Sequence, residues 1–383
     1  MSAIRNDVTM IATGEMMLCM PEDPLSFFDL VAPTLRSADL VVGHLENPHT
    51  RRPEPAWENM LAAPDPDNMV GLSAANFSLV TLAGNPAYSY GPPGIADTIE
   101  WLDEHGIAHV GTGMNIAEAT RPAILERNGT KFGFLSYDTV GVKENGASET
   151  KAGVAYVDII THYEPSRLSA GAPQMYTWAE PWSLKAMCEN IASLRGECDV
   201  LFVALHMGVT GQDVVLADYE AQISNAAIDA GADVILGYHC HVLKGIEFYK
   251  GKPIFHCLGN LVTTFPWEAH RSYRQRSNST LSNSRYRGQT GGGRSLIDPE
   301  YPLYPFPASS RNALMMKLLI SDGVVEKISY LPCLINKKAQ PEIVGKSPEG
   351  QQVFDYMQMV TSSAGLNARF EWDGDEVLVL DGS

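Results

Sequence analysis

The chain has 383 residues, of which 45% are hydrophobic and 19% are charged. This is an ordinary globular composition, with enough residues for one large α/β domain or two smaller ones. The formal net charge of −17 argues against non-specific binding to nucleic acid and against binding to an anionic membrane surface. An anionic small-molecule substrate remains compatible with this charge, because a metal ion or a local group of arginines reverses the field inside one cleft.

The N-terminal residues lack the charged, apolar and small-residue segments of a signal peptide. No apolar run in the sequence reaches the length of about 18 residues that a transmembrane helix needs. The six cysteines include no Cys-x-x-Cys pair and show no disulfide framework, which suits a reducing compartment. We therefore expect a soluble cytoplasmic protein.

Apolar runs alternate with helical patterns along the first 260 residues, which predicts a layered α/β fold with much parallel or mixed sheet. Strands are expected at residues 8–12, 38–42, 78–82, 107–110, 199–205 and 234–236, and hairpins at 123–137 and 245–258. Helices are expected at residues 24–36, 93–104, 182–194 and 218–230. The polar segment 141–173 shows no regular pattern and is interpreted as an irregular insert.

Five strand ends carry residues that can bind a metal, namely Glu15, Glu46, Asn85, His206 and the pair His239 and His241. Functional residues of such folds sit at the carboxyl ends of strands. Alternate side chains beyond a strand end point the same way, so His-x-His can aim two imidazoles at one point. This set of oxygen and nitrogen donors suits zinc, manganese or iron. Any one of these residues alone is equally compatible with an ordinary polar loop, but together they predict a metal site.

Residues 265–311 interrupt the alternation of strands and helices. They are rich in Ser, Gly, Pro and Tyr, and they contain seven arginines. A loop of this length is usually functional or disordered. As a lid it would bring Arg271, Tyr273 and Arg274 over the metal, where arginine binds a carboxylate or phosphate. As a disordered insert it would have no such role.

Beyond this loop, a hairpin is expected at residues 313–331, a helix at 350–360 and a closing strand pair at 368–380. The expected organisation is one domain at residues 1–340, which includes the lid at 265–311. The helix and strand pair at 341–383 are expected to pack on that same domain.

Six short motifs occur in a fixed order: Gly-Glu-Met-Met at 14–17, Gly-His-Leu-Glu-Asn at 43–47, Ala-Gly-Asn at 83–85, Leu-His-Met-Gly at 205–208, Gly-Tyr-His-Cys-His-Val at 237–242 and Leu-Gly-Asn at 258–260. This order resembles the poly-γ-glutamate capsule biosynthesis (CapA-like) family, which looks like a branch of the calcineurin-like metallophosphoesterases. The resemblance covers about residues 8–262, and residues 232–260 are its most specific part.

The resemblance implies an α/β fold, a four-layer αββα metallophosphoesterase-like sandwich, with one or two divalent metal ions (Zn, Mn or Fe). Carried over by position, the implied ligands are Glu15, Glu46, Asn85, His206, His239 and His241. One metal would take Asn85, His206, His239 and Glu46. A second would take Glu15, Glu46 and His241, a thinner set because Met17 stands where the superfamily adds a histidine.

Three residues depart from the family pattern. Glu15 replaces a shorter Asp, His44 stands where Asn is common, and Pro86 stands where the general-acid histidine is usual. Because proline transfers no proton, we do not expect an ordinary phosphatase. His44 is the first candidate for the proton donor, with His256 or a tyrosine such as Tyr88 as the second. The alternative for His44 is to orient Glu46.

The leading hypothesis is a metal-dependent hydrolase, in which a metal-bound hydroxide attacks an amide, ester or phosphoester of an anionic small molecule or γ-glutamyl substrate. Tyr88, Arg271, Tyr273 and Arg274 are the expected substrate-binding residues. One alternative is a metal-dependent lyase on a small, aromatic substrate, with His44 as the base. Another is a non-catalytic accessory protein of capsule-polymer synthesis. The expected partner is an anionic small molecule or short polymer, with no nucleic acid and no membrane, and self-association is left open.

Overall fold

The computed structural model describes residues 6–19, 23–54, 62–167, 171, 173–264 and 298–383. The predicted substrate-binding residues Arg271, Tyr273 and Arg274 lie outside the described residues, as does most of the expected lid. The elements that carry the other candidate site residues are all described.

The larger sheet has ten strands arranged around β1 (Asp7–Leu18), in the order β19-β20-β17-β16-β1-β2-β3-β4, with β15 paired to β1 and β18 paired to β17. The other strands are β2 (Leu40–Leu45), β3 (Leu79–Thr81), β4 (Ala108–Val110), β15 (Asn260–Thr264), β16 (Asn312–Ser321), β17 (Val324–Ile335), β18 (Pro341–Ile343), β19 (Ala368–Asp373) and β20 (Glu376–Asp381). Strand β1 runs parallel to β2 and β15 and antiparallel to β16. Its register shifts on both edges next to Glu15, and irregularities of this kind re-aim a side chain.

The smaller main sheet has six strands in the order β13-β14-β12-β11-β7-β6. Its strands are β6 (Ala123–Arg127), β7 (Thr130–Asp138), β11 (Val200–His206), β12 (Val234–Tyr238), β13 (Ile246–Tyr249) and β14 (Lys252–Phe255). The four central strands are parallel, and an antiparallel strand closes each edge. The carboxyl ends of β7, β11 and β12 therefore meet at one edge.

The two sheets pack face to face, because alternate residues of their strands share one core. Met10 and Val42 of the larger sheet join Phe134, Phe202 and Leu236 of the smaller sheet in one buried cluster. The residues between them along the strands face the opposite way, as the period of two in a strand requires. Burying both faces of both sheets removes a large apolar area from water, at about 25 cal/mol per Å².

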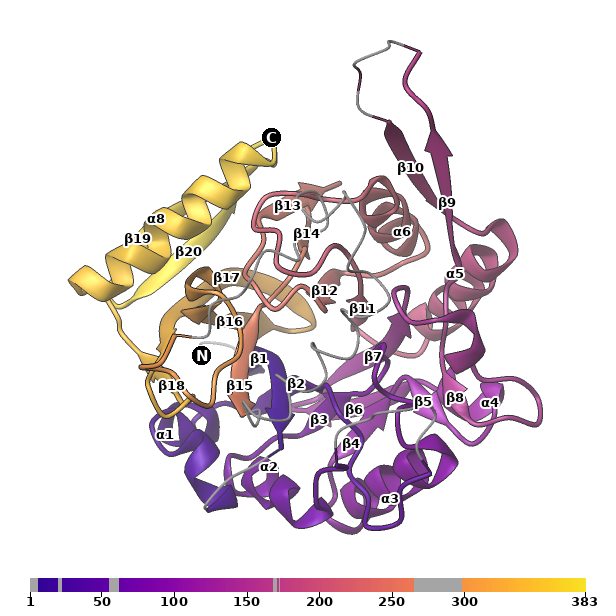
Figure 1. Cartoon of the computed structure of the whole chain (residues 1–383). Coiled ribbons are helices and arrows are strands. Elements are labelled where there is room, and N and C mark those ends of the chain that lie inside the picture. The colour runs from indigo at the N-terminus through magenta and orange to yellow at the C-terminus, as the bar shows by residue number, and fades with distance from the viewer. Residues whose placement is uncertain (1–5, 20–22, 55–61, 168–170, 172, 265–297) are drawn as a thin grey trace.

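Helices cover the two outer faces, giving four layers in all (Figure 1). The larger sheet is covered by η1 (Pro24–Phe28), α1 (Ala32–Arg36), η2 (Pro66–Met69), α2 (Val70–Ala74) and α3 (Gly91–Glu104). The smaller sheet is covered by α5 (Pro181–Arg195) and α6 (Asp218–Asp229). The predicted αββα sandwich is therefore confirmed. The helix expected at 24–36 is instead two short helices, joined by a turn in which Leu30 is exposed.

The segment predicted as an irregular insert is partly regular. It contains η3 (Lys143–Asn145) and β8 (Gly153–Val154), which pairs with β5 (Thr112–Gly113) near the short helix α4 (Ile116–Ala119). It also contains β9 (Ile159–Glu164), which pairs with β10 (Gln174–Ala179) as an antiparallel ribbon that projects from the body (Figure 1). The prediction missed β9 because its side chains are mostly exposed and its apolar and polar residues do not alternate.

The C-terminal residues add to the larger sheet. Strand β20 pairs with β17 at Ser329 and Tyr330, and α8 (Pro348–Ser363) buries Val353 and Met357 in the core that both sheets share. A short helix, η4 (Ala308–Arg311), precedes β16. Among the described residues, no helix is both long enough and apolar enough to cross a membrane.

Candidate metal centre

The six predicted ligands come together where the carboxyl ends of both sheets meet. Glu15 lies at the irregularity in β1, and Glu46 and Asn85 follow β2 and β3. His206 is the last residue of β11, while His239 and His241 follow β12. Asn85 is exposed and the other five are at most 8% exposed, so the cluster opens to solvent on the side of Asn85.

Glu46 is the residue that connects the cluster. His44 and His206 approach its Oε2 atom, with His44 Nε2 at 3.0 Å and His206 Nδ1 at 3.9 Å. His241 Nε2 lies 3.9 Å from the other oxygen, Oε1. Two sets of donor atoms result, one from His44, Glu46 and His206 and one from Glu15, Glu46 and His241, and within each set the atoms lie within 4.8 Å of one another. Because both sets use Glu46, the geometry is that of a carboxylate shared between two metal positions.

On the side that opens to solvent, Asn85 and two histidines bring a second group of donor atoms close together. The amide oxygen of Asn85 lies 2.8 Å from His206 Nε2 and 3.2 Å from His239 Nδ1, and these two nitrogens are 3.2 Å apart. Burial lowers the pKa of His239 to about 3, and burial together with the neighbouring histidines holds the pKa of His206 well below its usual range. Both rings are therefore neutral, which is the form that binds a metal.

Glu15 binds the loop that carries His239 and His241. One of its oxygens accepts a hydrogen bond from the backbone N–H of His239, and the other lies 2.5 Å from His241 Nδ1. Burial alone would lower the pKa of His241, but the carboxylates of Glu15 and Glu46 raise it to about 9. Asn260 Oδ1 lies 3.0 Å from the same Nδ1 atom. With Nδ1–H directed at these oxygens, Nε2 remains available to a metal on the side of Glu46.

The two carboxylates have opposite protonation tendencies. Burial opposes the ionisation of Glu15, but the neighbouring His241 lowers its pKa. Burial and the nearby Glu15 carboxylate raise the pKa of Glu46. A bound cation would offset the burial of Glu46, since an opposite charge within a few ångströms favours the ionised form.

The His-Cys-His loop is strained. His239 and His241 have φ angles of 91° and 55°, a region that costs a non-glycine residue about 1–3 kcal/mol. Cys240 between them is fully buried and points away from the cluster, with Sγ 3.3 Å from the carbonyl oxygen of Met207. Surrounding contacts hold the loop in this conformation, in which the His241 imidazole faces the carboxylates of Glu15 and Glu46 and the His239 imidazole faces Asn85 and Thr210.

His44, a predicted catalytic residue, lies inside the cluster. Its Nδ1 atom is 2.9 Å from Thr81 Oγ1, its Nε2 atom faces Glu46, and its ring stacks on Tyr238 at 4.7 Å. The geometry is compatible with both predicted roles, proton transfer and orientation of Glu46. It also adds a third role, since His44 belongs to one of the two donor sets.

His256, the other predicted catalytic residue, lies apart from the cluster. It is fully buried, with Nε2 3.1 Å from Glu247 and Nδ1 3.9 Å from Glu220. The prediction placed it near the metal because it lies between His241 and Asn260 in the sequence. The hairpin that carries it instead directs its ring toward α6 and β13, so the structure gives it no access to the reaction.

The predicted substrate-binding residue Tyr88 lies three residues beyond Asn85. It is half-buried, and Lys151 Nζ lies 4.3 Å from the centre of its ring. Pro86, between Asn85 and Tyr88, carries no group that transfers a proton. The ammonium group of this lysine also donates hydrogen bonds to the carbonyl oxygens of Glu144 and Gly146.

Three further residues lie around the cluster, of which sequence reasoning missed Thr210 and Asp138 and named Phe306 as an aromatic residue of the lid. Thr210 Oγ1 lies 2.7 Å from His239 Nε2, and the Phe306 ring packs on His241 at 4.4 Å. Asp138 ends β7 beside His206, and burial raises the pKa of its carboxyl group to about 6. Asp138 follows a predicted strand, so the rule that selected the other ligands would have found it.

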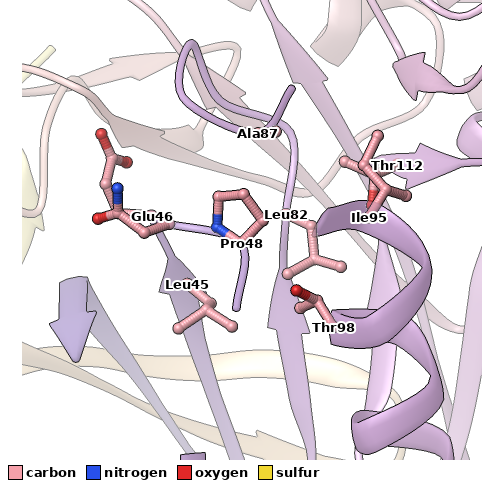
Figure 2. A pocket seen from close by; sticks show the side chains of 9 residues that line it. Leu45, Glu46, Pro48, Leu82, Ala87, Ile95, Thr98 and Thr112 are labelled. Atoms are coloured by element: carbon pink, nitrogen blue, oxygen red, sulfur yellow. The ribbon is translucent and has the colours of Figure 1, made fainter. Parts of the chain in front are cut away.

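A small cavity lies next to Glu46. It has a volume of about 10 Å³, enough for roughly one water molecule, and is lined by Leu45, Glu46, Asn47, Pro48, Leu82, Ala87, Ile95, Thr98 and Thr112. Figure 2 shows the Glu46 carboxylate directed away from the apolar residues of this cavity. The cavity is too small to hold a substrate.

The residues present fit a divalent metal. Nitrogen and oxygen donors converge, the histidines that face Asn85 are neutral, and buried His206 Nδ1 has no hydrogen-bond partner among the described residues. A buried polar atom left unpaired costs about 1–3 kcal/mol, and a metal ligated at this nitrogen removes that cost. The donor types suit zinc, manganese or iron.

The fold is a four-layer αββα sandwich whose strand ends carry the polar donor cluster. The chain belongs to the family described as bacterial capsule synthesis protein PGA_cap, whose model matches residues 5–264. The matched segment contains all six predicted ligands, His44 and His256.

Curated relatives agree with this family. The chain is 28% identical to the PGA biosynthesis protein CapA of Bacillus subtilis over 249 residues, which cover 64% of this chain and 59% of that protein. It is 28% identical to the capsule biosynthesis protein CapA of Bacillus anthracis over 262 residues, which cover 66% of this chain and 58% of that protein. The chain therefore spans less than two thirds of these relatives.

Among solved structures, the chain is similar to a phosphatase from Mycoplasma pneumoniae, with 14% identity and a TM-score of 0.46 over 92% of this chain and 100% of the other. It is also similar to the calcineurin-like phosphoesterase YfkN from Bacillus subtilis, with 14% identity and a TM-score of 0.39 over 93% and 99% of the two chains.

Proposed function

We propose that this chain is a metal-dependent hydrolase acting on an anionic small molecule or a γ-glutamyl substrate. The observation that carries the proposal is the position of Glu46, whose two oxygens face separate sets of buried donor atoms. Carboxylate sharing of this kind occurs in two-metal hydrolytic sites, in which a pair of ions stabilises the attacking and the leaving oxygen.

Each residue of the cluster has a proposed role. His206 would hold one metal ion either through Nδ1, together with Glu46 and His44, or through Nε2, together with Asn85 and His239. Glu15, Glu46 and His241 would hold a second. Divalent ions bound there supply Lewis acidity and lower the pKa of a bound water toward about 7. Asn85 and Thr210 are exposed at the open side, where they would contact the substrate.

We assign proton transfer to His44. Asp138 replaces His256 as the second candidate, because His256 lies apart from the cluster. His44 Nε2 lies 3.0 Å from Glu46 Oε2, close enough to exchange a proton with that carboxylate. Asp138 lies on the neighbouring strand end, and its raised pKa of about 6 leaves part of it protonated near neutral pH. Either group would supply the proton that Pro86 cannot.

The substrate class follows from the family and from the open side of the cluster. The Bacillus relatives carry names that refer to PGA or capsule biosynthesis, and poly-γ-glutamate is an anionic polymer. Lys151 lies above the ring of Tyr88, three residues beyond Asn85, and is a cation in this part of the chain. We therefore favour a γ-glutamyl amide over a neutral substrate.

The first test is metal analysis of the purified chain together with His239→Ala. We expect the wild type to retain a transition metal and the variant to lose it, with loss of hydrolysis of γ-glutamyl-p-nitroanilide. Absence of metal from the wild type after reconstitution with Zn²⁺, Mn²⁺ and Fe²⁺ would refute the proposal. Rapid turnover of p-nitrophenyl phosphate would instead assign phosphatase chemistry.

Two other functions each have one supporting observation. A relative from Mycobacterium tuberculosis, 25% identical over 213 residues, is named a probable polyglutamine synthesis accessory protein, which favours a non-catalytic role in polymer synthesis. The Phe306 ring against His241 favours a lyase with a small aromatic substrate. Retained metal without turnover of amide, ester or phosphoester substrates would support the accessory role, and formation of a double bond without uptake of water would support the lyase.

A further inference from the structure

A second buried polar cluster lies behind the His-Cys-His loop, on the side away from the metal centre. It consists of Lys244, Glu220 and Cys240, and we call it the rear cluster. The side chains of Lys244 and Glu220 are fully buried, and Lys244 Nζ lies 3.7 Å from Glu220 Oε1. The Lys244 ammonium group also donates hydrogen bonds to the Val215 carbonyl oxygen, at 2.6 Å, and to the Cys240 thiol.

The rear cluster joins the two loops that carry the histidines. Cys240 lies between His239 and His241, and its thiol donates to the carbonyl oxygen of Met207, the residue after His206. The backbone N–H of Gly211 donates to the carbonyl oxygen of Cys240 at 2.9 Å. Displacement of Cys240 would therefore move His239 and His241 and alter the contact with the His206 loop.

Helix α6 anchors the cluster from behind. Glu220 accepts a hydrogen bond from the backbone N–H of Ala217 at 2.7 Å. A Cβ atom added to Gly208 would lie 2.8 Å from Cys240 Sγ and 2.9 Å from Glu220 Oε2. Packing is therefore so close that the loop after His206, the His-Cys-His loop and α6 move only together.

Stability alone does not explain a buried lysine at this place. Replacing a buried ion pair with apolar side chains of similar volume is often neutral or stabilising, whereas removing one partner leaves an uncompensated charge. Strained backbone persists only where its surroundings over-determine it. The rear cluster lies directly behind the two strained histidines, whose contacts on the other side include Glu15, Asn85, Thr210 and Asn260.

We infer that Lys244 and Glu220 are positioning residues, which hold the strained His-Cys-His loop so that His239 and His241 are preorganised to bind metal. The inference rests on the metal site of the proposed function. It adds that metal affinity depends on a charge pair that touches neither metal nor substrate. Residues that orient metal ligands typically change affinity by about 10–100-fold when replaced.

The test compares three variants of the full chain: Lys244→Met, Lys244→Met with Glu220→Gln, and Arg195→Met as the matched control. Arg195 pairs with Asp233 at 2.5 Å, at the opposite end of β12. For each variant we would measure the Zn²⁺ dissociation constant by chelator competition, the visible spectrum of the Co²⁺-loaded protein and the thermal midpoint of the metal-free protein.

Lys244→Met is expected to weaken Zn²⁺ binding by about 10–100-fold and to change the Co²⁺ spectrum. The double variant should bind Zn²⁺ more tightly than Lys244→Met, because replacing Glu220 with Gln leaves no unpaired buried carboxylate. Arg195→Met should lower the thermal midpoint with Zn²⁺ affinity and Co²⁺ spectrum unchanged. If Lys244→Met does not fold, the same comparison is made with the double variant, which should bind Zn²⁺ more weakly than the control.

Equal Zn²⁺ affinity and an identical Co²⁺ spectrum in wild type and Lys244→Met, with only the thermal midpoint lowered, would overturn the inference. The same result for the double variant would overturn it when the single variant cannot be purified. Failure of the wild-type chain to bind any of Zn²⁺, Co²⁺, Mn²⁺ and Fe²⁺ would refute the proposed function itself, so the two failures are distinguishable.

Discussion

Buried histidines occur in two settings in this molecule. His44, His206, His239 and His241 lie at the carboxyl ends of strands, where their nitrogens converge on Glu46, Glu15 and Asn85. His49 and His256 are equally buried but lie elsewhere. The nitrogens of His49 face the carbonyl oxygens of Asn47 and Leu18, and His256 faces Glu247 and Glu220.

The difference shows that burial of a histidine does not identify a ligand. In the first setting, several donors from different strands point at common positions. An unpaired nitrogen does not separate the two settings, because His206 Nδ1 and His256 Nδ1 both lack a hydrogen-bond partner among the described residues. In the second setting, each ring faces groups that fix it within the fold. Convergence of donors from several strands is therefore the criterion, and the following predictions test it.

Replacing Glu46 with Gln should have the largest effect. The substitution removes the charge that both donor sets share, and an unpaired buried charge costs about 3–5 kcal/mol, so metal affinity should fall by roughly 1,000-fold. Isothermal titration of Zn²⁺ or Mn²⁺ into the metal-free protein measures this. Asp97→Asn, at a carboxylate paired with Arg52, is the control that should bind metal normally. An unchanged dissociation constant in Glu46→Gln would refute the shared-carboxylate arrangement.

His49 should govern part of the pH dependence of stability. Burial lowers its pKa to about 4, below the unfolded value of about 6.5. Its contribution is complete above pH 6.5 and is lost as the pH falls toward 4, by about 3 kcal/mol at pH 4. As the pH falls from 7 to 4, the difference in the free energy of unfolding between the wild type and His49→Asn should therefore become smaller. A constant difference over this range would contradict the prediction.

Replacing His44 with Gln should weaken metal binding by about 10–100-fold, as expected for a group that orients or completes a ligand set. A His44→Asn variant restores the residue that is common in the family and offers a shorter amide. If His44 also transfers a proton, kcat should fall in both variants even at saturating metal. Normal kcat at saturating metal would limit His44 to holding the metal or orienting Glu46.

His256→Gln should have the smallest effect on the metal centre. Because His256 does not reach the cluster, the Zn²⁺ dissociation constant should be unchanged, while the free energy of unfolding falls by about 1–3 kcal/mol through the loss of a buried polar contact. Measuring both quantities on one preparation separates the two settings directly. A large loss of metal affinity would place His256 among the residues that support the ligands.

The sequence predicted the sandwich and the strand ends because both depend on short-range pattern. Apolar runs such as that before Gly237 mark buried strands, and parallel strand ends meet at one edge. It did not predict that Glu15 would bind the His-Cys-His loop, because that contact depends on the register irregularity in β1. Asp138 was overlooked although the strand-end rule would have found it, and only the raised pKa of its buried carboxyl group could not be predicted from the sequence.

His256 shows that spacing in the sequence can also suggest a contact that the fold does not make. Its spacing from His241 suggested proximity, but β14 and β13 form a hairpin that carries the ring toward Glu247. The predicted irregular insert at 141–173 was wrong in part for a related reason. Strand β9 is stabilised by pairing with β10, and pairing between distant segments leaves little trace in local composition.

Glu15 lies within the paired region of the larger sheet, between β2 and β15, and is not in a loop. A side chain on the neighbouring Gly14 would overlap the carbonyl oxygen of Gly259, so insertions and most substitutions here would disrupt the sheet. Thr210 and Phe306, which face the open side, belong to connecting segments that tolerate change in length. The donor framework therefore depends on paired strands, whereas the open side depends on connecting segments, and a change in the length of those segments would leave the donors in place.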